Sequence, residues 1–261
     1  MWWRRISPFL GWLVLGCAAL AAEPEAGTIG EGKDWATAYY VQEGKEAGPT
    51  VLVVGGMHGD ELAGARAAAE IAQWPIARGK LVVIPRANEA ALGKRRRLSP
   101  AGDDRDLNRD FPQAAGEEAK GDLATAIWQF VAALKPDWLL DLHESHGFRQ
   151  QLKSSNGSTI IRDTRRATRT KAQAMLDAIN ATIEEADRKF VLLRGPVKGG
   201  IARSASDLLG THAMILETTS TKQPIELRVR QHHLLVRRLL DDLKMLPQGF
   251  DPFAPGEKQA Q

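Results

Sequence analysis

The chain contains 261 residues, of which 43% are hydrophobic and 26% are charged, which fits one soluble domain with a single large core. The formal net charge is +3, and it falls to about +1 (3 minus 2) without Arg4 and Arg5 of an N-terminal leader. A balance this close to neutral excludes the strongly basic surface of a nucleic-acid-binding protein.

Residues 1–21 are predicted to form a signal peptide. Arg4 and Arg5 precede an apolar run over residues 6–20, which ends in small side chains like those of a cleavage site. This run is shorter than the ~20 residues that a membrane-spanning helix needs. We therefore expect an exported, periplasmic protein. Residues 14–17 also resemble a bacterial lipobox, so a lipid anchor at Cys17 is the only membrane contact that we expect.

A βαβ unit begins the predicted domain. Residues 35–44 have strand character, and residues 49–56 form a continuous β-branched run, typical of a strand buried on both faces of a parallel sheet. Alanine, leucine and isoleucine at helical spacing predict a helix over residues 60–74. A second buried strand at residues 80–88 completes the unit.

A long charged segment follows at residues 89–112, where we expect a functional loop. Strands and helices then alternate to the end of the domain. We predict a helix at 117–134, a buried strand at 136–144, a short strand at 158–162, a helix at 168–187, strands at 189–195 and 212–220, and a closing helix at 224–246.

The predicted organisation is a single α/β domain over residues 35–247, with helices on both faces of a central sheet. A polar, glycine-rich linker is expected at residues 22–34, and a flexible tail at residues 248–261.

Polar side chains follow three of the predicted buried strands. His58 and Glu61 come directly after one strand, and Glu217 lies near the end of another. His143 and Glu144 end the third. In open α/β sheets the binding crevice lies beyond the carboxyl ends of the strands, so we expect these groups at one site.

Two histidines and one carboxylate form the ligand set of a catalytic zinc site, whose fourth position is left for water. His58, Glu61 and His143 therefore predict a site for one zinc ion, with His146 as an alternative to His143. Glu217 is the predicted general base. Glu144 is its alternative, although neighbouring strand residues face opposite ways, which points Glu144 away from the metal.

The segment "DLNRDFP", residues 106–112, offers groups that bind an anionic substrate. Arg109 can hold a carboxylate by a planar two-point contact, and Asn108 adds a neutral donor. Taken alone, the segment also fits a charged loop in which acids and arginines neutralise one another.

Four motifs in this order, "GGMHGDE", "DLNRDFP", "DLHE" and "ILETT", resemble the zinc carboxypeptidase superfamily, and above all its branch of succinylglutamate desuccinylases and aspartoacylases. The resemblance spans roughly residues 48–220. It implies a zinc carboxypeptidase-like, phosphorylase/hydrolase-like fold with a mixed, twisted sheet.

The resemblance also implies roles for single residues. The implied zinc ligands are His58, Glu61 and His143, the general base and acid is Glu217, and the pair that receives the terminal carboxylate of the substrate is Asn108 and Arg109. Asp106 matches the acid that orients the first zinc histidine.

Arg97 matches the arginine that polarises the scissile carbonyl, but extra residues nearby leave Arg95 and Arg96 open. One feature departs from digestive carboxypeptidases. They carry a tyrosine before the strand of the catalytic acid, whereas the only tyrosines here are Tyr39 and Tyr40.

The predicted function is cleavage of an amide bond next to a carboxylate by an exported zinc hydrolase. Export favours a metallocarboxypeptidase or amidase acting on peptidoglycan stem peptides or other small peptides. The alternatives are an N-acyl amino acid deacylase of the desuccinylase or aspartoacylase type, and a non-catalytic zinc-site domain that binds peptides or glycans. The expected partner is a small substrate with a free carboxylate, and no nucleic acid.

Overall fold

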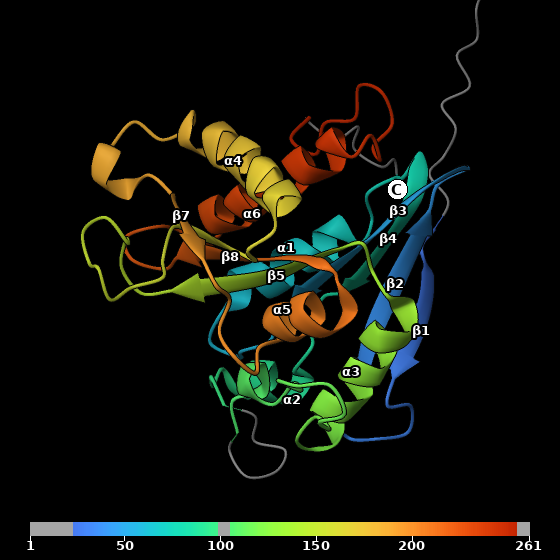
Figure 1. The fold of residues 1–261 in the computed structure, drawn as a ribbon. Coiled ribbons are helices and arrows are strands. Elements are labelled where there is room, and N and C mark those ends of the chain that lie inside the picture. The colour runs from blue at the N-terminus through green and yellow to red at the C-terminus, as the bar shows by residue number, and fades with distance from the viewer. Residues whose placement is uncertain (1–22, 99–104, 255–261) are drawn as a thin grey trace, which may run out of the picture.

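A mixed, twisted sheet of eight strands forms the centre of the molecule, in the order β1-β2-β4-β3-β5-β8-β6-β7 (Figure 1). The computed structural model describes residues 23–98 and 105–254. Strands β4, β3, β5 and β8 are parallel, β2 runs antiparallel to β1 and β4, and β6 runs antiparallel to β8. The strands are β1 (Glu25–Ile29), β2 (Thr37–Glu43), β3 (Glu46–Gly55), β4 (Arg78–Ile84), β5 (Trp138–Ser145), β6 (Thr159–Arg162), β7 (Val191–Arg194) and β8 (His212–Thr219).

Helices cover both faces of the sheet. One face carries α1 (Leu62–Ile71), α4 (Arg166–Asn180) and α6 (Ile225–Asp242), and the other carries α3 (Asp122–Leu134) and α5 (Ile201–Ser204). Val51 and Val53 of β3 pack toward the first group, while Leu52 and Val54 pack toward the second. Side chains alternate along a strand, so a strand covered on both faces reads as one continuous apolar run. The predicted α/β fold is confirmed.

Two segments differ from the predicted organisation. The predicted linker over residues 22–34 contains β1, of which only Ile29 is buried, so this strand is held by backbone pairing with β2. The described part of the predicted flexible tail packs on the domain, because Phe250 contacts Trp74 and Asp251 pairs with Arg237. Both segments extend the domain beyond residues 35–247.

Two irregular regions contain short helices that the sequence does not predict. The charged segment at residues 89–112 begins with α2 (Glu89–Lys94), capped by the Asn88 side chain, and ends with the 3-10 helix Leu107–Arg109. Between β7 and β8, α5 continues into one π-helical segment, Ala205–Leu209. Both helical regions place residues at the site described below.

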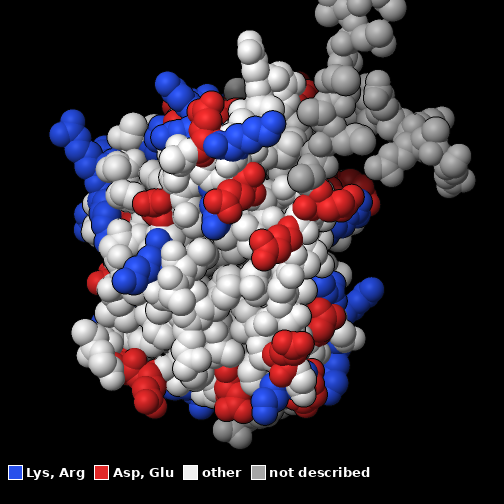
Figure 2. Space-filling model, turned by 90° about the vertical axis from the view of Figure 1, so that its right-hand side faces the viewer, with Lys and Arg blue, Asp and Glu red and all other residues white. Residues whose placement is uncertain are grey.

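The predicted signal peptide, including Cys17, lies outside the described residues, as do the last residues of the tail. Among the residues that are described, no helix is long and apolar enough to cross a membrane. Figure 2 shows one face of the molecule, on which acidic and basic side chains are interspersed around a largely uncharged centre.

Candidate active site

Glycines allow the turn after β3 to approach its neighbours closely. Gly56 adopts φ of +69°, a conformation that L side chains rarely adopt. A Cβ atom on Gly64 would lie 2.5 Å from the carbonyl oxygen of Leu142, so only glycine lets α1 pack this closely on β5. The turn and the helix start thereby bring His58 and Glu61 beside the end of β5.

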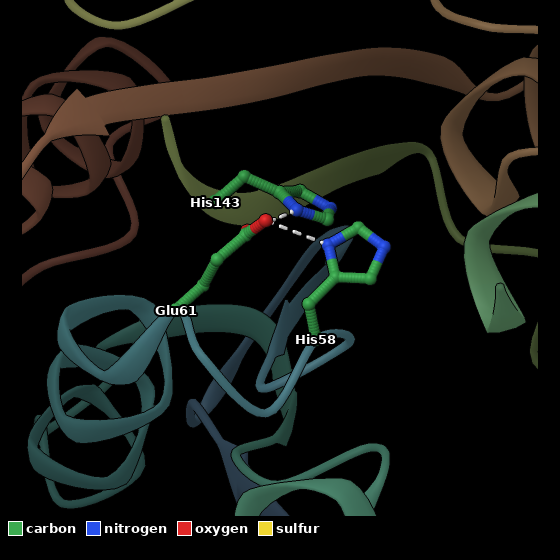
Figure 3. Close-up of side chains that lie close together, drawn as sticks. All are labelled: His58, Glu61 and His143. Atoms are coloured by element: carbon green, nitrogen blue, oxygen red, sulfur yellow. Dashed lines mark hydrogen bonds and ion pairs between the residues drawn. The ribbon is translucent and has the colours of Figure 1, made fainter. Parts of the chain in front are cut away.

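His58, Glu61 and His143 converge at this point (Figure 3). Glu61 Oε1 lies 2.8 Å from His58 Nδ1, and Glu61 Oε2 lies 2.7 Å from His143 Nδ1. One donor atom from each residue lies within 4.8 Å of the other two, and all three residues are buried. His146 is exposed and contacts Ser220 instead, so the structure favours His143 over His146.

The second ring nitrogen of each histidine faces a carboxylate. His58 Nε2 lies 2.8 Å from Asp106 Oδ1, and His143 Nε2 lies 2.9 Å from Asp141 Oδ2. Such partners fix the ring orientation and leave each Nδ1 directed at the shared centre. Imidazole and carboxylate donors held in this way fit a bound metal ion. Asp141 is a site residue that the sequence analysis missed, although it lies two positions before His143 on the same face of the strand.

Charge and burial act against each other on the acids of this centre. Burial raises the pKa of Glu61, but the charges and hydrogen bonds of His143 and His58 outweigh it and lower this pKa well below the ordinary value. The pKa of Asp106 is likewise lowered, because the hydrogen bond and charge of His58 outweigh burial. Both carboxylates are therefore held ionised as acceptors.

Arg97 reaches the centre. Its Nη1 donates to Glu61 Oε1 at 2.9 Å, and its Nη2 donates to Asp106 Oδ2 at 3.2 Å. Arg95 instead caps α2 in a left-handed conformation, and among the described residues Arg97 alone of Arg95, Arg96 and Arg97 lines the cavity. The geometry thus favours Arg97 for contact with a substrate.

Asn108 and Arg109 differ in their freedom to bind a substrate. Asn108 is buried, its Oδ1 accepts from the Ile201 backbone N–H at 3.0 Å, and its Nδ2 donates to Asp141 at 3.1 Å. The same Nδ2 lies 3.0 Å from His143 Nε2, so the side chain braces the site rather than facing a ligand. Arg109 donates to the Asn108 carbonyl, its side chain is 44% exposed, and it lines the cavity.

Glu217 and Glu144 face opposite sides of the sheet. Glu217 of β8 is the register partner of His143, so both side chains point to the same face. Its Oε2 is buried without a hydrogen-bond partner among the described residues, and burial raises its pKa to about 8. Glu144 accepts from the Ala63 backbone N–H and from Arg228, away from the cavity centre, as the sequence predicted.

A cavity of about 590 Å³ opens over these groups. Its polar floor holds the histidines, Glu61 and Glu217, and Arg97 and Arg109 bring positive charge to its walls. Ile161, Leu193 and Ile215, in register on three adjacent strands, form an apolar wall. The cavity therefore suits a small molecule with an anionic group and an apolar body.

Comparison with known proteins identifies the family. The model of the succinylglutamate desuccinylase/aspartoacylase catalytic domain matches residues 47–243. The chain belongs to this family. The match begins in β3 and ends just after α6, so it includes every residue of the centre described above.

One curated relative and several solved structures resemble this family member. Over 99 residues the chain is 33% identical to N-alpha-acetyl-L-2,4-diaminobutyric acid deacetylase of Halomonas elongata. The aligned residues are 37% of this chain and 28% of that protein. Product-bound cell shape determinant protein Csd4 of Helicobacter pylori gives a TM-score of 0.69 at 20% identity, over 82% of this chain and 56% of that one.

Succinylglutamate desuccinylase/aspartoacylase of Rhodobacter sphaeroides gives a TM-score of 0.59 at 22% identity, over 81% of this chain and 60% of that one. At such identities the solved structures establish the carboxypeptidase-like fold. The chain spans less than two thirds of the length of each of these three relatives.

Proposed function

We propose that this protein is an exported zinc-dependent hydrolase that cleaves an amide bond next to a carboxylate. One observation carries the proposal. A buried cluster of His58, Glu61 and His143 shares one cavity with the exposed cation Arg109 and with Glu217, whose Oε2 has no hydrogen-bond partner among the described residues. Metal donors, a proton acceptor and an anion anchor are the three groups that such a reaction needs.

The donor set matches a catalytic zinc site. His58 and His143 each present Nδ1 toward Glu61 and are oriented from behind by Asp106 and Asp141. Zinc held by these residues supplies a Lewis acid that polarises a carbonyl group and acidifies water. His58, Glu61 and His143 would supply the three protein donors that catalytic zinc sites use.

The remaining residues position the substrate and move protons. The Arg109 guanidinium binds the substrate carboxylate by a two-point contact and thereby fixes the adjacent amide over the cavity floor. Glu217 accepts a proton from the attacking water and returns it to the leaving amine. Arg97 donates a hydrogen bond to the oxyanion that develops on the carbonyl oxygen.

We propose peptidoglycan stem peptides, or other small peptides, as substrates of a carboxypeptidase or amidase reaction. The support is the predicted signal peptide, together with the Csd4 structures, one of which is described as a D,L-carboxypeptidase in its mDAP-bound form. The second candidate is N-acyl amino acid deacylation. The family and the Halomonas elongata deacetylase favour it.

The test is to incubate the purified zinc-loaded protein with a mixture of muropeptides and N-acyl amino acids and to identify the products by mass spectrometry. Loss of a C-terminal residue from muropeptides supports the first candidate, and release of free amino acids from acylated ones supports the second. If neither class is cleaved, the proposal fails, and a non-catalytic peptide- or glycan-binding domain becomes the better explanation.

Glu217→Gln is the matched control variant for this experiment. Glutamine keeps the size of the side chain but cannot accept the proton, so we expect unchanged zinc content and a loss of turnover of at least ~100-fold. If turnover persists in this variant, Glu217 is not the base.

A further inference from the structure

A group of three arginines lies between α4 and the last two strands of the sheet. Arg162 and Arg194 end β6 and β7, where they are register partners, and Arg169 is the fourth residue of α4. Register partners on adjacent strands point to the same face, and like charges placed opposite each other destabilise a sheet. Arg162 is partly buried, and Arg169 and Arg194 are exposed, so two like charges lie side by side where β6 and β7 end.

Within the described residues, none of the three arginines forms a salt bridge. Asp163, which follows Arg162, is engaged by Arg165 and by the Thr168 hydroxyl. Elsewhere the same chain pairs its arginines with acids. Examples are Arg66 with Glu70, Arg86 with Glu89, Arg203 with Asp207, and Arg238 with Asp242.

Arg162 carries an unused donor. Its Nη1 donates to the Asp163 carbonyl oxygen, but its buried Nε has no hydrogen-bond partner among the described residues. Burial, followed by the charges of Arg169 and Arg194, lowers the pKa of Arg162, so these cations repel one another. A buried, unsatisfied donor on a charged group is costly and points to a missing acceptor.

Arg194, at the end of β7, also lines the catalytic cavity, whereas Arg162 and Arg169 do not. Three guanidinium groups offer a triply positive site with many planar N–H donors. A single carboxylate carries one negative charge and two oxygens, which leaves most of these donors unused. A phosphate monoester or inorganic phosphate carries up to two charges and at least three acceptor oxygens, and matches the site better.

We propose that Arg162, Arg169 and Arg194 form a phosphate-binding site where β6 and β7 end beside α4, which takes either free phosphate or a phosphate monoester headgroup on a lipid surface. The site is distinct from the Asn108 and Arg109 region, and its existence does not depend on the proposed hydrolysis. Bound phosphate bridges strands β6 and β7 to α4 and relieves the repulsion between their arginines.

The test titrates inorganic phosphate into the zinc-loaded full chain at pH 8 by isothermal calorimetry. We expect millimolar or tighter binding, weakened about tenfold or more in Arg162→Gln and Arg194→Gln, since each variant loses hydrogen bonds to a charged group. Arg66→Gln is the matched control, an exposed arginine on α1, and binds phosphate like the wild type. Absence of binding at about 10 mM phosphate overturns the proposal. Equal binding by Arg194→Gln and wild type also overturns it, because phosphate then binds at another site, such as the His58, Glu61 and His143 cluster.

Thermal unfolding supplies a second measurement. In phosphate-free buffer Arg194→Gln is expected to melt at a higher temperature than the wild type, because one repelling charge is gone, and phosphate is expected to reverse this order. A lower melting temperature of Arg194→Gln in phosphate-free buffer contradicts the repulsion on which the site is argued. Flotation with phosphatidic acid vesicles, without inorganic phosphate, distinguishes the two sources. If the wild type binds the vesicles and Arg194→Gln does not, the ligand is a lipid headgroup. If the wild type binds inorganic phosphate but not the vesicles, the ligand is free phosphate.

Discussion

The two histidines of the centre differ in the carboxylates that orient them. Asp106, which faces His58, lies on a loop and its side chain is 18% exposed, whereas Asp141, which faces His143, is fully buried inside β5. Asp141 also receives the Asn108 amide. A fully buried acceptor holds its histidine more rigidly than a partly hydrated one, so Asp141 is expected to contribute more than Asp106 to metal affinity.

Asp141→Asn is therefore predicted to weaken zinc binding by about 10–100-fold, because the amide is a poorer, uncharged acceptor for the His143 ring N–H. Competition with a chromophoric chelator measures this affinity. Asp137→Asn is the matched control just before the same strand, where the Asp137 side chain accepts from the Thr50 backbone N–H, and it is expected to bind zinc normally. If Asp141→Asn binds zinc as tightly as the wild type, Asp141 does not contribute to zinc binding.

Sequence patterns predict residues of the centre that follow or end an apolar run and miss those whose role depends on a distant partner. His58, Glu61, His143 and Glu217 follow or end buried strands, and the structure brings them together. Asp141 lies inside such a run, and its function depends on Asn108, which a separate loop delivers. Sequence spacing alone does not show that Asn108 is braced rather than free.

At the scale of elements, α6 connects to the His58, Glu61 and His143 cluster from the opposite face of the sheet. Arg228 of α6 donates to Glu144 Oε2, while Glu144 Oε1 accepts from the Ala63 backbone N–H at 2.6 Å. The Glu144 backbone N–H in turn donates to Glu61 Oε2 at 3.0 Å. The ion pair of Arg228 and Glu144 thereby connects α6, the start of α1 and the end of β5 next to Glu61.

Arg228→Met is predicted to lower the free energy of unfolding by about 3 kcal/mol, because it leaves the buried Glu144 carboxylate without its cation. Urea unfolding followed by circular dichroism measures the loss. Arg238→Met serves as the control on the same helix, where the exposed pair with Asp242 contributes less than about 1 kcal/mol. The double variant Arg228→Met, Glu144→Gln is expected to recover part of the loss, and an additive loss would contradict the coupling.

The predicted and observed elements differ where tertiary contacts outweigh local composition. Strand β1 has only one buried residue, so its composition reads as a linker, and its pairing with β2 becomes visible only in the folded sheet. Helix α2 is six residues long and lies in a basic segment, and burial of Ala91 and Leu92 stabilises it. The long buried strands need no such context, because their β-branched runs already specify them.

At the scale of the whole molecule, a metal at this centre would join two of the central strands. His58 and Glu61 follow β3, and His143 lies on β5, which pairs with β3 through the middle of the sheet. A ligand that binds the folded chain but not the unfolded chain stabilises the fold by mass action. The stability of the domain should therefore report zinc binding without any assay of turnover.

Zinc at 100 times its dissociation constant is predicted to raise the free energy of unfolding by about 2.7 kcal/mol, and chelation to remove this gain. For a domain of this size that corresponds to a shift of several degrees in melting temperature, which differential scanning calorimetry resolves. His143→Ala lacks one donor and is expected to lose the response, whereas Glu217→Gln keeps all three donors and retains it. Equal zinc-induced shifts in melting temperature in wild type and His143→Ala would place the zinc elsewhere. A shift confined to proteins with all three donors would link the His58, Glu61 and His143 cluster to the stability of the whole sheet.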